Sequence, residues 1–268
     1  MPVMRILSLN TYGGRIPRLL EYLRHQDADV YCLSEMFRAP DSPGAQATDD
    51  DGSLPRLDLF DDIKAVLPGH EGFFHPFAKY HLNDGVTTLI PAYYGIATFV
   101  RSTIPILAHH SDFVFRNYTG KPFGEPPLPR NAHSVRLARS DGSTLVVTHL
   151  HGLWQKTGKG DTLERSQQAL GLFDLLDRSV RTGEPAVLCG DLNVLPENAM
   201  LEILRLRGWR DLIREYDVRD TRTSLYDKPG KSRYADYLLV TGGVRVNDFL
   251  VPNEPEVSDH RPLILDCA

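Results

Sequence analysis

The chain has 268 residues, of which 41% are hydrophobic and 24% are charged, and its formal net charge at pH 7 is −5. This composition is typical of a folded globular protein, and no apolar run reaches the roughly 18 residues of a membrane-spanning helix. The negative charge argues against a protein that binds a long phosphate backbone without sequence specificity, although a local basic groove is compatible with it.

Short apolar runs recur along the chain and predict strands, several with the period-two alternation of a half-buried strand. The predicted strands cover residues 5–9, 30–33, 96–100, 132–137, 145–150, 186–189, 237–240 and 263–267. Helical periodicity predicts helices near residues 16–23 and 169–180, and a third from Glu197 to about Arg207, closed by Gly208. Asp141-Gly142 predicts a hairpin turn. Segments 38–52 and 117–130 predict long loops that rim a site.

Strands mixed with helices and a hairpin predict mixed sheets covered by helices on their outer faces. No linker composition divides the chain, so we expect a single domain over residues 1–268. The first residues lack the features of a signal peptide, and the three cysteines lie within or beside apolar runs. We therefore expect reduced core thiols, no membrane span and a cytoplasmic protein, with no protein partner evident.

Polar side chains recur where the predicted strands end. In α/β architectures ligands bind at such ends, because side chains from different strands converge there. Each of these residues alone could be a turn, a helix cap or a solvated surface group, but together they predict one functional rim. They are Asn10, Glu35, His149, His151, Asp191, Asn193, Asp259 and His260.

Six short motifs, in chain order, resemble those of the endonuclease/exonuclease/phosphatase family. They lie at residues 7–10 (LSLN), 32–35 (CLSE), 147–150 (VTHL), 188–194 (LCGDLNV), 234–238 (YADYL) and 258–260 (SDH). The resemblance covers nearly the whole chain. It implies the α/β fold of that family, a four-layer α/β/β/α sandwich with two packed mixed β-sheets, and a metal-dependent hydrolase of phosphoester bonds.

The resemblance also implies a metal site. A phosphoester is negatively charged and resists attack by water, so its hydrolysis needs charge neutralisation and an activated nucleophile. Glu35 would supply a hard oxygen ligand to Mg²⁺, for which Mn²⁺ can substitute, with Asn10 beside it. Asp259 would orient the metal or its water.

By the same resemblance, Asp191 would be the general base and Asn193 would hydrogen-bond the phosphate. His260 would contact a non-bridging phosphate oxygen, and Asp236 would hold His260 in the right orientation. His149 would be a second imidazole that stabilises the transition state or protonates the leaving oxygen.

Four further residues are candidates for substrate binding. Arg130 resembles a phosphate-contacting arginine of the deoxyribonuclease branch, and His151 would lie on the same strand face as His149. Arg222 and Arg233 belong to a basic segment that leads into Asp236 and could hold a phosphate or an anionic head group. A solvated surface role is the alternative for each arginine.

Substrate identity stays open at the level of sequence. His149 replaces the tyrosine usual in the abasic-site endonuclease branch, so the chain is more similar to the deoxyribonuclease, sphingomyelinase and inositol-phosphatase branches. We expect a phosphodiesterase or nuclease-like enzyme. One alternative is a phosphatase or phosphodiesterase for a small phosphorylated molecule or lipid head group. The other is a catalytically silent binding module, which metal-dependent turnover would exclude.

Overall fold

The computed structural model describes residues 3–48, 52–83, 89–118 and 128–268, and within them two six-stranded sheets pack face to face. The first sheet has the order β11-β12-β1-β2-β4-β3 and the second β5-β6-β7-β8-β10-β9. Their strands are β1 Met4–Asn10, β2 Val30–Arg38, β3 His70–Asn83, β4 Leu89–Arg101, β5 Ile106–Phe115, β6 Arg130–Ala138, β7 Thr144–Leu150, β8 Ala186–Asp191, β9 Trp209–Asp211, β10 Asp236–Thr241, β11 Val246–Leu250 and β12 Leu263–Cys267.

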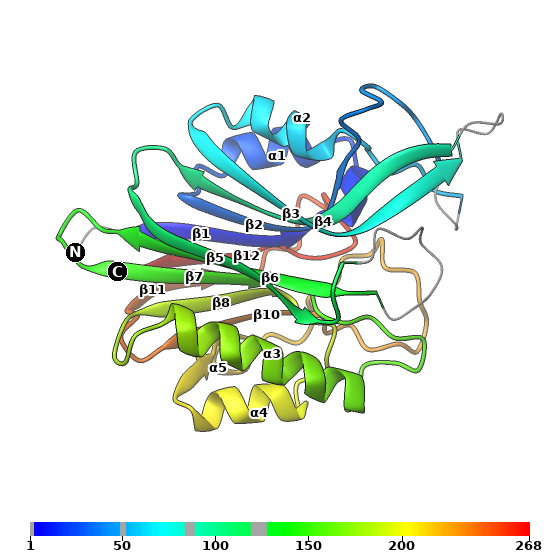
Figure 1. Cartoon of the computed structure of the whole chain (residues 1–268). Coiled ribbons are helices and arrows are strands. Elements are labelled where there is room, and N and C mark those ends of the chain that lie inside the picture. The colour runs from blue at the N-terminus through cyan, green and yellow to red at the C-terminus, as the bar shows by residue number, and fades with distance from the viewer. Residues whose placement is uncertain (1–2, 49–51, 84–88, 119–127) are drawn as a thin grey trace.

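Helices form the two outer layers (Figure 1). The helices α1 Leu19–His25 and α2 Leu59–Val66 cover the first sheet, and α3 Leu163–Ser179, α4 Ala199–Leu206 and α5 Leu212–Glu215 cover the second. A short 3-10 turn, Tyr12–Gly14, follows β1. The predicted four-layer α/β/β/α sandwich with two mixed sheets is confirmed.

The period-two pattern of β1 explains how one strand serves two cores. Ile6 packs in the cluster between the sheets, whereas Leu7 and Leu9 pack in the cluster beneath α1 and α2. All three side chains are buried, and burying one leucine or isoleucine stabilises a protein by roughly 1.5–3 kcal/mol. The sheets are therefore held both to each other and to their helices.

Every predicted strand lies within an observed one, each predicted helix overlaps an observed one, and Gly142 forms the predicted hairpin turn between β6 and β7. Four strands (β3, β5, β9 and β11) and the helices α2 and α5 were not predicted. The three cysteines are buried free thiols, as expected. In the predicted long loops, positions 49–51 and 119–127 lie outside the described residues. Among the residues that are described, no helix is long and apolar enough to cross a membrane.

Strand direction brings the predicted polar residues to one end of the sandwich. β1 and β2 run parallel with Asn10 beside Ser34, and β8 and β10 run antiparallel with Asp191 beside Asp236. The two chain termini lie together at the opposite end (Figure 1). The strand ends of both sheets therefore meet at one rim.

Candidate active site

A β-bulge aims Glu35 into the rim. The pairing of β2 with β4 shifts register between Leu33 and Met36, and Glu35 adopts a left-handed backbone with φ of 56°. Thr11 holds this conformation, because its Oγ1 donates to the Ser34 carbonyl at 2.8 Å. Bulges and positive-φ residues of this kind are found near functional sites, where they redirect a side chain.

Asp191 is presented by an equally constrained strand end. At Gly190, with φ of 136°, a Cβ atom would lie 2.0 Å from the Leu150 carbonyl oxygen of β7, so only glycine fits. Asn193, with φ of 55°, then turns the chain, and its backbone N–H donates to Asp191 Oδ1 at 3.0 Å. The close approach of two strands and the following turn fix the direction of the carboxylate.

Asn10 joins the two sheets across the site. Its Nδ2 donates to Glu35 Oε1 at 3.0 Å and to Asp191 Oδ2 at 2.9 Å. Ser258 Oγ donates to the Asn10 carbonyl at 2.6 Å and accepts from the backbone N–H of His260 at 3.1 Å. The serine of the SDH motif thus fixes the position of His260 relative to Asn10, a role that the sequence did not reveal.

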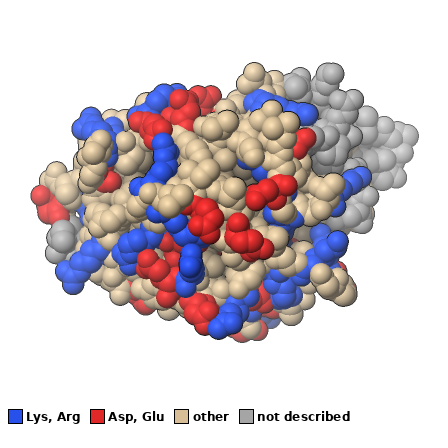
Figure 2. Space-filling model, turned by 90° about the horizontal axis from the view of Figure 1, so that it is seen from below, with Lys and Arg blue, Asp and Glu red and all other residues tan. Residues whose placement is uncertain are grey.

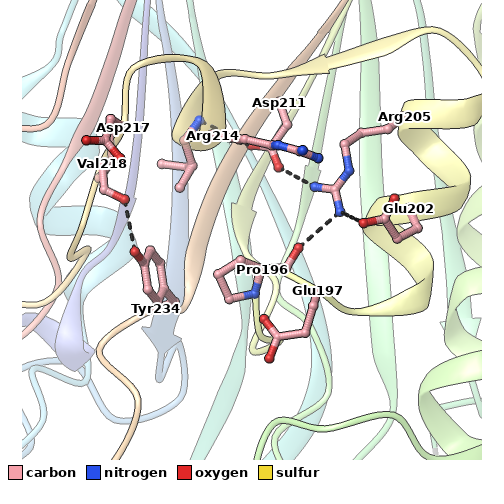
Figure 3. Close-up of a pocket in the computed structure, with 10 residues that line it drawn as sticks. Pro196, Glu197, Glu202, Arg205, Asp211, Arg214, Asp217, Val218 and Tyr234 are labelled. Atoms are coloured by element: carbon pink, nitrogen blue, oxygen red, sulfur yellow. Dashed lines mark hydrogen bonds and ion pairs between the residues drawn. The ribbon is translucent and has the colours of Figure 1, made fainter.

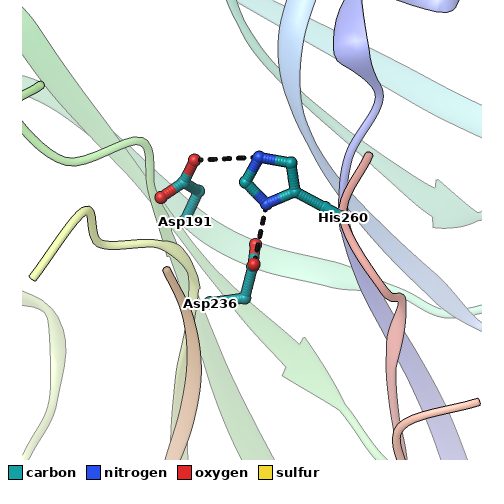
Figure 4. Close-up of side chains that lie close together, drawn as sticks. All are labelled: Asp191, Asp236 and His260. Carbon is teal, nitrogen blue, oxygen red and sulfur yellow. Dashed lines mark hydrogen bonds and ion pairs between the residues drawn. The ribbon is translucent and has the colours of Figure 1, made fainter. Parts of the chain in front are cut away.

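Three buried side chains form a connected chain, which Figure 4 shows. His260 Nδ1 lies 2.7 Å from Asp236 Oδ2, and His260 Nε2 lies 3.6 Å from Asp191 Oδ2. All three are at most 2% exposed. A carboxylate thus orients one ring nitrogen, and the other faces a second carboxylate in a site largely closed to water.

Neighbouring charges set the protonation of this chain. Although burial alone would raise it, the positive charges of His260 and Arg222 hold the pKa of Asp191 below its usual range. Burial and Arg222 disfavour the charged form of His260, but Asp236, Asp259 and Asp191 outweigh them and raise the pKa of His260. The pair therefore favours a carboxylate at Asp191 and an imidazolium at His260.

The carboxylates Glu35 and Asp259 repel each other electrostatically, and their environment fits a divalent cation. Burial, followed by the negative charge of Asp259, raises the pKa of Glu35. Asp259 Oδ2 is paired with Arg222 Nη1 at 2.6 Å, but its Oδ1 is buried without a hydrogen-bond partner among the described residues. Hard carboxylate oxygens of this kind suit Mg²⁺.

Asp191, Asp236 and His260 also lie close enough together to hold a metal, since their ligand atoms are within 4.8 Å of one another. However, Asp236 and His260 already satisfy each other through the 2.7 Å hydrogen bond. Glu35, which no cation contacts among the described residues, and Asp259, whose Oδ1 has no hydrogen-bond partner among them, are therefore the better candidates for metal binding.

His149 in β7 and His151 just after it occupy different environments. His149 lies opposite Cys189 on the parallel strand β8, two residues before Asp191, and its Nε2 lies 3.1 Å from Ser34 Oγ in the interior. His151, two residues further along, places Nε2 3.8 Å from Asp191 Oδ2. Burial, followed by the charge of Arg130, lowers the pKa of His151 to about 3, so its ring is neutral.

The predicted arginines differ in what they touch. Arg222 is buried, pairs with Asp259 and stacks on Tyr226, with its guanidinium carbon 4.3 Å from the ring centre. Arg130 donates from Nε to the Gly152 carbonyl at 2.9 Å, next to His151. Arg233 instead pairs with Asp220 and donates to the Arg222 and Thr223 carbonyls, so it braces the loop that carries Arg222.

Sequence reasoning did not single out Lys159 as a site residue. Its Nζ donates to the Tyr234 carbonyl, two residues before Asp236, from the loop between β7 and α3. Burial lowers the pKa of Lys159, and the negative charges of Asp191 and Asp236 partly oppose this shift. Only the flanking glycines, Gly158 and Gly160, mark Lys159 in the sequence, and they do not reveal whether its side chain points towards the site.

Figure 3 shows a separate pocket of about 380 Å³, lined by residues that include Tyr234, Arg205 and Asp211. Tyr234, which lines it, donates from its hydroxyl to the Val218 carbonyl at 3.2 Å. Arg205 in the same pocket pairs with Glu202 and Asp211 at 2.7 and 2.8 Å. This arginine is already neutralised within the pocket, which contains none of the residues of the proposed catalytic chain.

The face over α3, α4 and α5 carries interspersed positive and negative side chains (Figure 2). Ion pairs account for several of them, including Arg178 with Asp112 and Asp174, Arg207 with Asp177, and Arg210 with Glu215. A protein that binds nucleic acid through this face would be expected to show a basic stripe. The face in Figure 2 shows none.

The family model described as the endonuclease/exonuclease/phosphatase family matches residues 7–260. No curated protein sequence matches the chain significantly. An endonuclease/exonuclease/phosphatase structure from Beutenbergia cavernae superposes with a TM-score of 0.71 at 19% identity, covering 100% of this chain and 72% of that one.

Two further solved structures have the same fold. A mannosyl-6-phosphatase from Bacteroides thetaiotaomicron gives a TM-score of 0.68 at 17% identity, covering 99% of both chains. The human nocturnin catalytic domain with a bound sulfate anion gives 0.67 at 18% identity, covering 100% of this chain and 93% of that one. The chain belongs to the endonuclease/exonuclease/phosphatase family, whose members are metal-dependent phosphoester hydrolases.

Proposed function

We propose that the protein is a Mg²⁺-dependent phosphoester hydrolase in which Asp191 activates the attacking water. The observation that carries this proposal is the buried chain from Asp191 through His260 to Asp236, with separations of 3.6 and 2.7 Å. A base, an orienting acid and a cationic imidazole held together in this way are what phosphoester hydrolysis needs at neutral pH.

The protonation states assign the roles within the chain. Because its pKa is lowered, Asp191 is ionised and can accept a proton from water. His260, with its raised pKa, donates from Nε2 to a non-bridging phosphate oxygen, while Asp236 keeps Nδ1 protonated and the ring in place. Asn193 makes only a long 3.4 Å bond from Nδ2 to the Gly152 carbonyl, so its amide can donate to the phosphate.

Glu35 and Asp259 would hold the metal ion, with Asn10 at their side. The ion neutralises charge on the phosphate when it is bound. Arg222 fixes Asp259 through their 2.6 Å ion pair and adds a positive charge near the phosphate. Mn²⁺ would substitute for Mg²⁺, because both prefer oxygen ligands.

We propose that His151 supplies the second imidazole of the site, the role that the family resemblance gives to His149. The supporting observation is its 3.8 Å separation from Asp191, whereas His149 bonds to Ser34 inside the sandwich. As a neutral imidazole next to Asp191, His151 can hydrogen-bond the attacking water or the substrate. Arg130 positions His151 by binding the carbonyl of the next residue, Gly152.

Two substrate classes fit this site. A phosphodiester, nucleic acid included, is the reading favoured by the sequence resemblance. A small phosphorylated molecule is favoured by the net charge of −5. The acidic charge weighs against tight binding of a long polymer.

Hydrolysis of a mixed substrate panel tests this proposal. It contains single- and double-stranded DNA, RNA, inositol phosphates, sphingomyelin, p-nitrophenyl phosphate and bis-p-nitrophenyl phosphate, each with Mg²⁺ or with EDTA. We expect metal-dependent release of product from at least one phosphoester. Nucleic acid as the preferred substrate, with cleavage that falls steeply with salt, would select the first class. If the folded protein hydrolysed no substrate of the panel, the proposal would be contradicted.

A further inference from the structure

We propose that Lys159 is a substrate-binding residue that holds the anionic oxygens of the phosphate in this site. The inference rests on the proposed function and adds a residue that no motif of the chain contains. Lys159 belongs to the loop between β7 and α3, eight positions after His151. Its ammonium group hydrogen-bonds the Tyr234 carbonyl at the entrance to β10.

The loop that carries Lys159 is held by a buried arginine. Arg165, in the first turn of α3 and 4% exposed, donates from Nη2 to the Gly158 carbonyl at 2.6 Å and from Nη1 to the Gly160 carbonyl at 2.5 Å. It also reaches the Leu153 carbonyl at 3.3 Å. The carbonyls on both sides of Lys159 are therefore bound by one guanidinium group, which fixes where the lysine points.

Among the described residues, Lys159 makes a single hydrogen bond, to the neutral Tyr234 carbonyl, although its ammonium group has three donors. Lys159 is partly buried, and its bond to Tyr234 lies two residues before Asp236, whose charge acts on it together with those of Asp191 and Arg222. A phosphate bound opposite His260 would bring oxygen acceptors with full negative charge to this ammonium group. A hydrogen bond between two oppositely charged groups is stronger than one from an ammonium group to a neutral carbonyl, so the lysine would gain by binding the phosphate.

A purely structural role is the competing explanation. In that case Lys159 would only fasten the loop to Tyr234, and its removal would reduce stability without changing phosphate affinity. The two roles are separated by measuring phosphate binding and thermal stability in the same variants. Lys156, an exposed lysine of the same loop, provides a matched control.

The test measures the inhibition constant of inorganic phosphate, kcat/KM for the best substrate of the panel, and Tm. The proteins are wild type, Lys159→Met, Lys159→Arg and Lys156→Met. We expect Lys159→Met to weaken phosphate inhibition and lower kcat/KM by about tenfold to a hundredfold, the range of a charged hydrogen bond. Lys159→Arg should restore part of both, and Lys156→Met should stay within about twofold of wild type.

The proposal is overturned if Lys159→Met lowers Tm but leaves phosphate inhibition and kcat/KM within twofold of wild type. If the wild-type protein had no activity, that result would instead contradict the proposed function. Phosphate binding is then compared by calorimetry in wild type and Lys159→Met. Weaker binding in the variant would still support this role of Lys159, whereas equal binding, or none to either protein, would overturn it.

Discussion

Each acidic residue of the site is held in a distinct electrostatic state by its neighbours. Asp191 lies among positive charges that favour its ionised form, whereas Glu35 is partly buried, the charge of Asp259 acts on it, and its pKa is raised. The first environment suits a base that must be ionised at neutral pH. In the second environment, a bound cation would relieve the repulsion between Glu35 and Asp259. This difference in environment is why we assign Asp191 as the general base and Glu35 as a metal ligand.

Replacing Glu35 by glutamine tests the assignment of the metal site. We expect the Mg²⁺ concentration needed for half-maximal activity to rise at least tenfold, because one of the two proposed carboxylate ligands is lost. Without metal, Glu35→Gln should be at least as stable as wild type, since charge repulsion with Asp259 disappears. Activity titrations and thermal unfolding measure both, with Glu71→Gln on the surface as control. Unchanged Mg²⁺ dependence would remove Glu35 from the site.

Asp236 is expected to act through His260. Asp236→Asn preserves the shape of the side chain but removes the charge that accepts the 2.7 Å bond from His260 Nδ1. We predict a fall in kcat of about a hundredfold or more with a much smaller change in KM, because orientation of the imidazole matters in the transition state. Steady-state kinetics measure it, and Asp217→Asn, an exposed carboxylate, is the control. A change confined to KM would contradict the role.

At the scale of the elements, sequence reasoning succeeded where hydrophobic pattern and tertiary burial agree. The eight predicted strands include those whose ends carry Asn10, Glu35, Asp191 and Asp236, so the rim itself was predictable. β3 contains Gly72 and Pro76, and β5 is largely exposed on one edge of its sheet, so neither has the apolar alternation of a central strand.

Which of the two histidines, His149 or His151, lies near Asp191 could not be predicted from sequence. Both His149 and His151 point to the same face of an extended chain, so periodicity treats them alike. The parallel register with β8 places His149 beside Cys189 and leaves His151 nearer to Asp191. Such a register is a property of the assembled sheet. For the same reason, the position of Lys159 could not be predicted from sequence, because Arg165 of α3 fixes the loop that carries it.

The close contact of β7 and β8 predicts that Gly190 cannot be replaced. In Gly190→Ala the new methyl would lie 2.0 Å from the Leu150 carbonyl oxygen, so a strand must move and Asp191 moves with it. We expect a loss of about 2–4 kcal/mol in stability and a large loss of activity. Gly142→Ala has a similarly unfavourable φ of 82° but no atom near its new methyl, so it should cost about 1 kcal/mol. Urea unfolding distinguishes them, and equal losses would contradict the contact argument.

At the scale of the whole molecule, the sandwich contains polar links between its two sheets. His133 of β6 lies 3.0 Å from Thr98 Oγ1 of β4, and His149 of β7 lies 3.1 Å from Ser34 Oγ of β2. His133 is 1% exposed, and its Nε2 has no partner among the described residues. The interface between the sheets is therefore apolar in the middle and polar along these histidines, which must remain neutral while buried.

This arrangement predicts loss of stability in acid. Burial lowers the pKa of His133 to about 2, so as the pH falls below about 6.5 the unfolded chain takes up a proton that the folded protein does not. The contribution of neutral His133 to the free energy of unfolding is fully present above pH 6.5 and is lost progressively as the pH falls towards 2. From pH 6.5 to pH 5 this residue alone should cost about 2 kcal/mol. Urea unfolding at both pH values should show a smaller drop in His133→Asn than in wild type.

The control for that measurement is His110→Asn, which changes an exposed histidine of β5. It should retain the pH dependence of wild type. If His133→Asn retained it too, protonation of His133 would not limit stability in acid.

The central claim is that Asp191 is the base of a metal-dependent phosphoester hydrolase. Its most direct test is the Mg²⁺-dependent rate of wild type and Asp191→Asn on the best substrate of the panel, with circular dichroism to confirm folding. We predict that wild type loses activity in EDTA and regains it with Mg²⁺, and that folded Asp191→Asn falls by at least about a thousandfold in kcat. Turnover in Asp191→Asn within tenfold of wild type would contradict the claim.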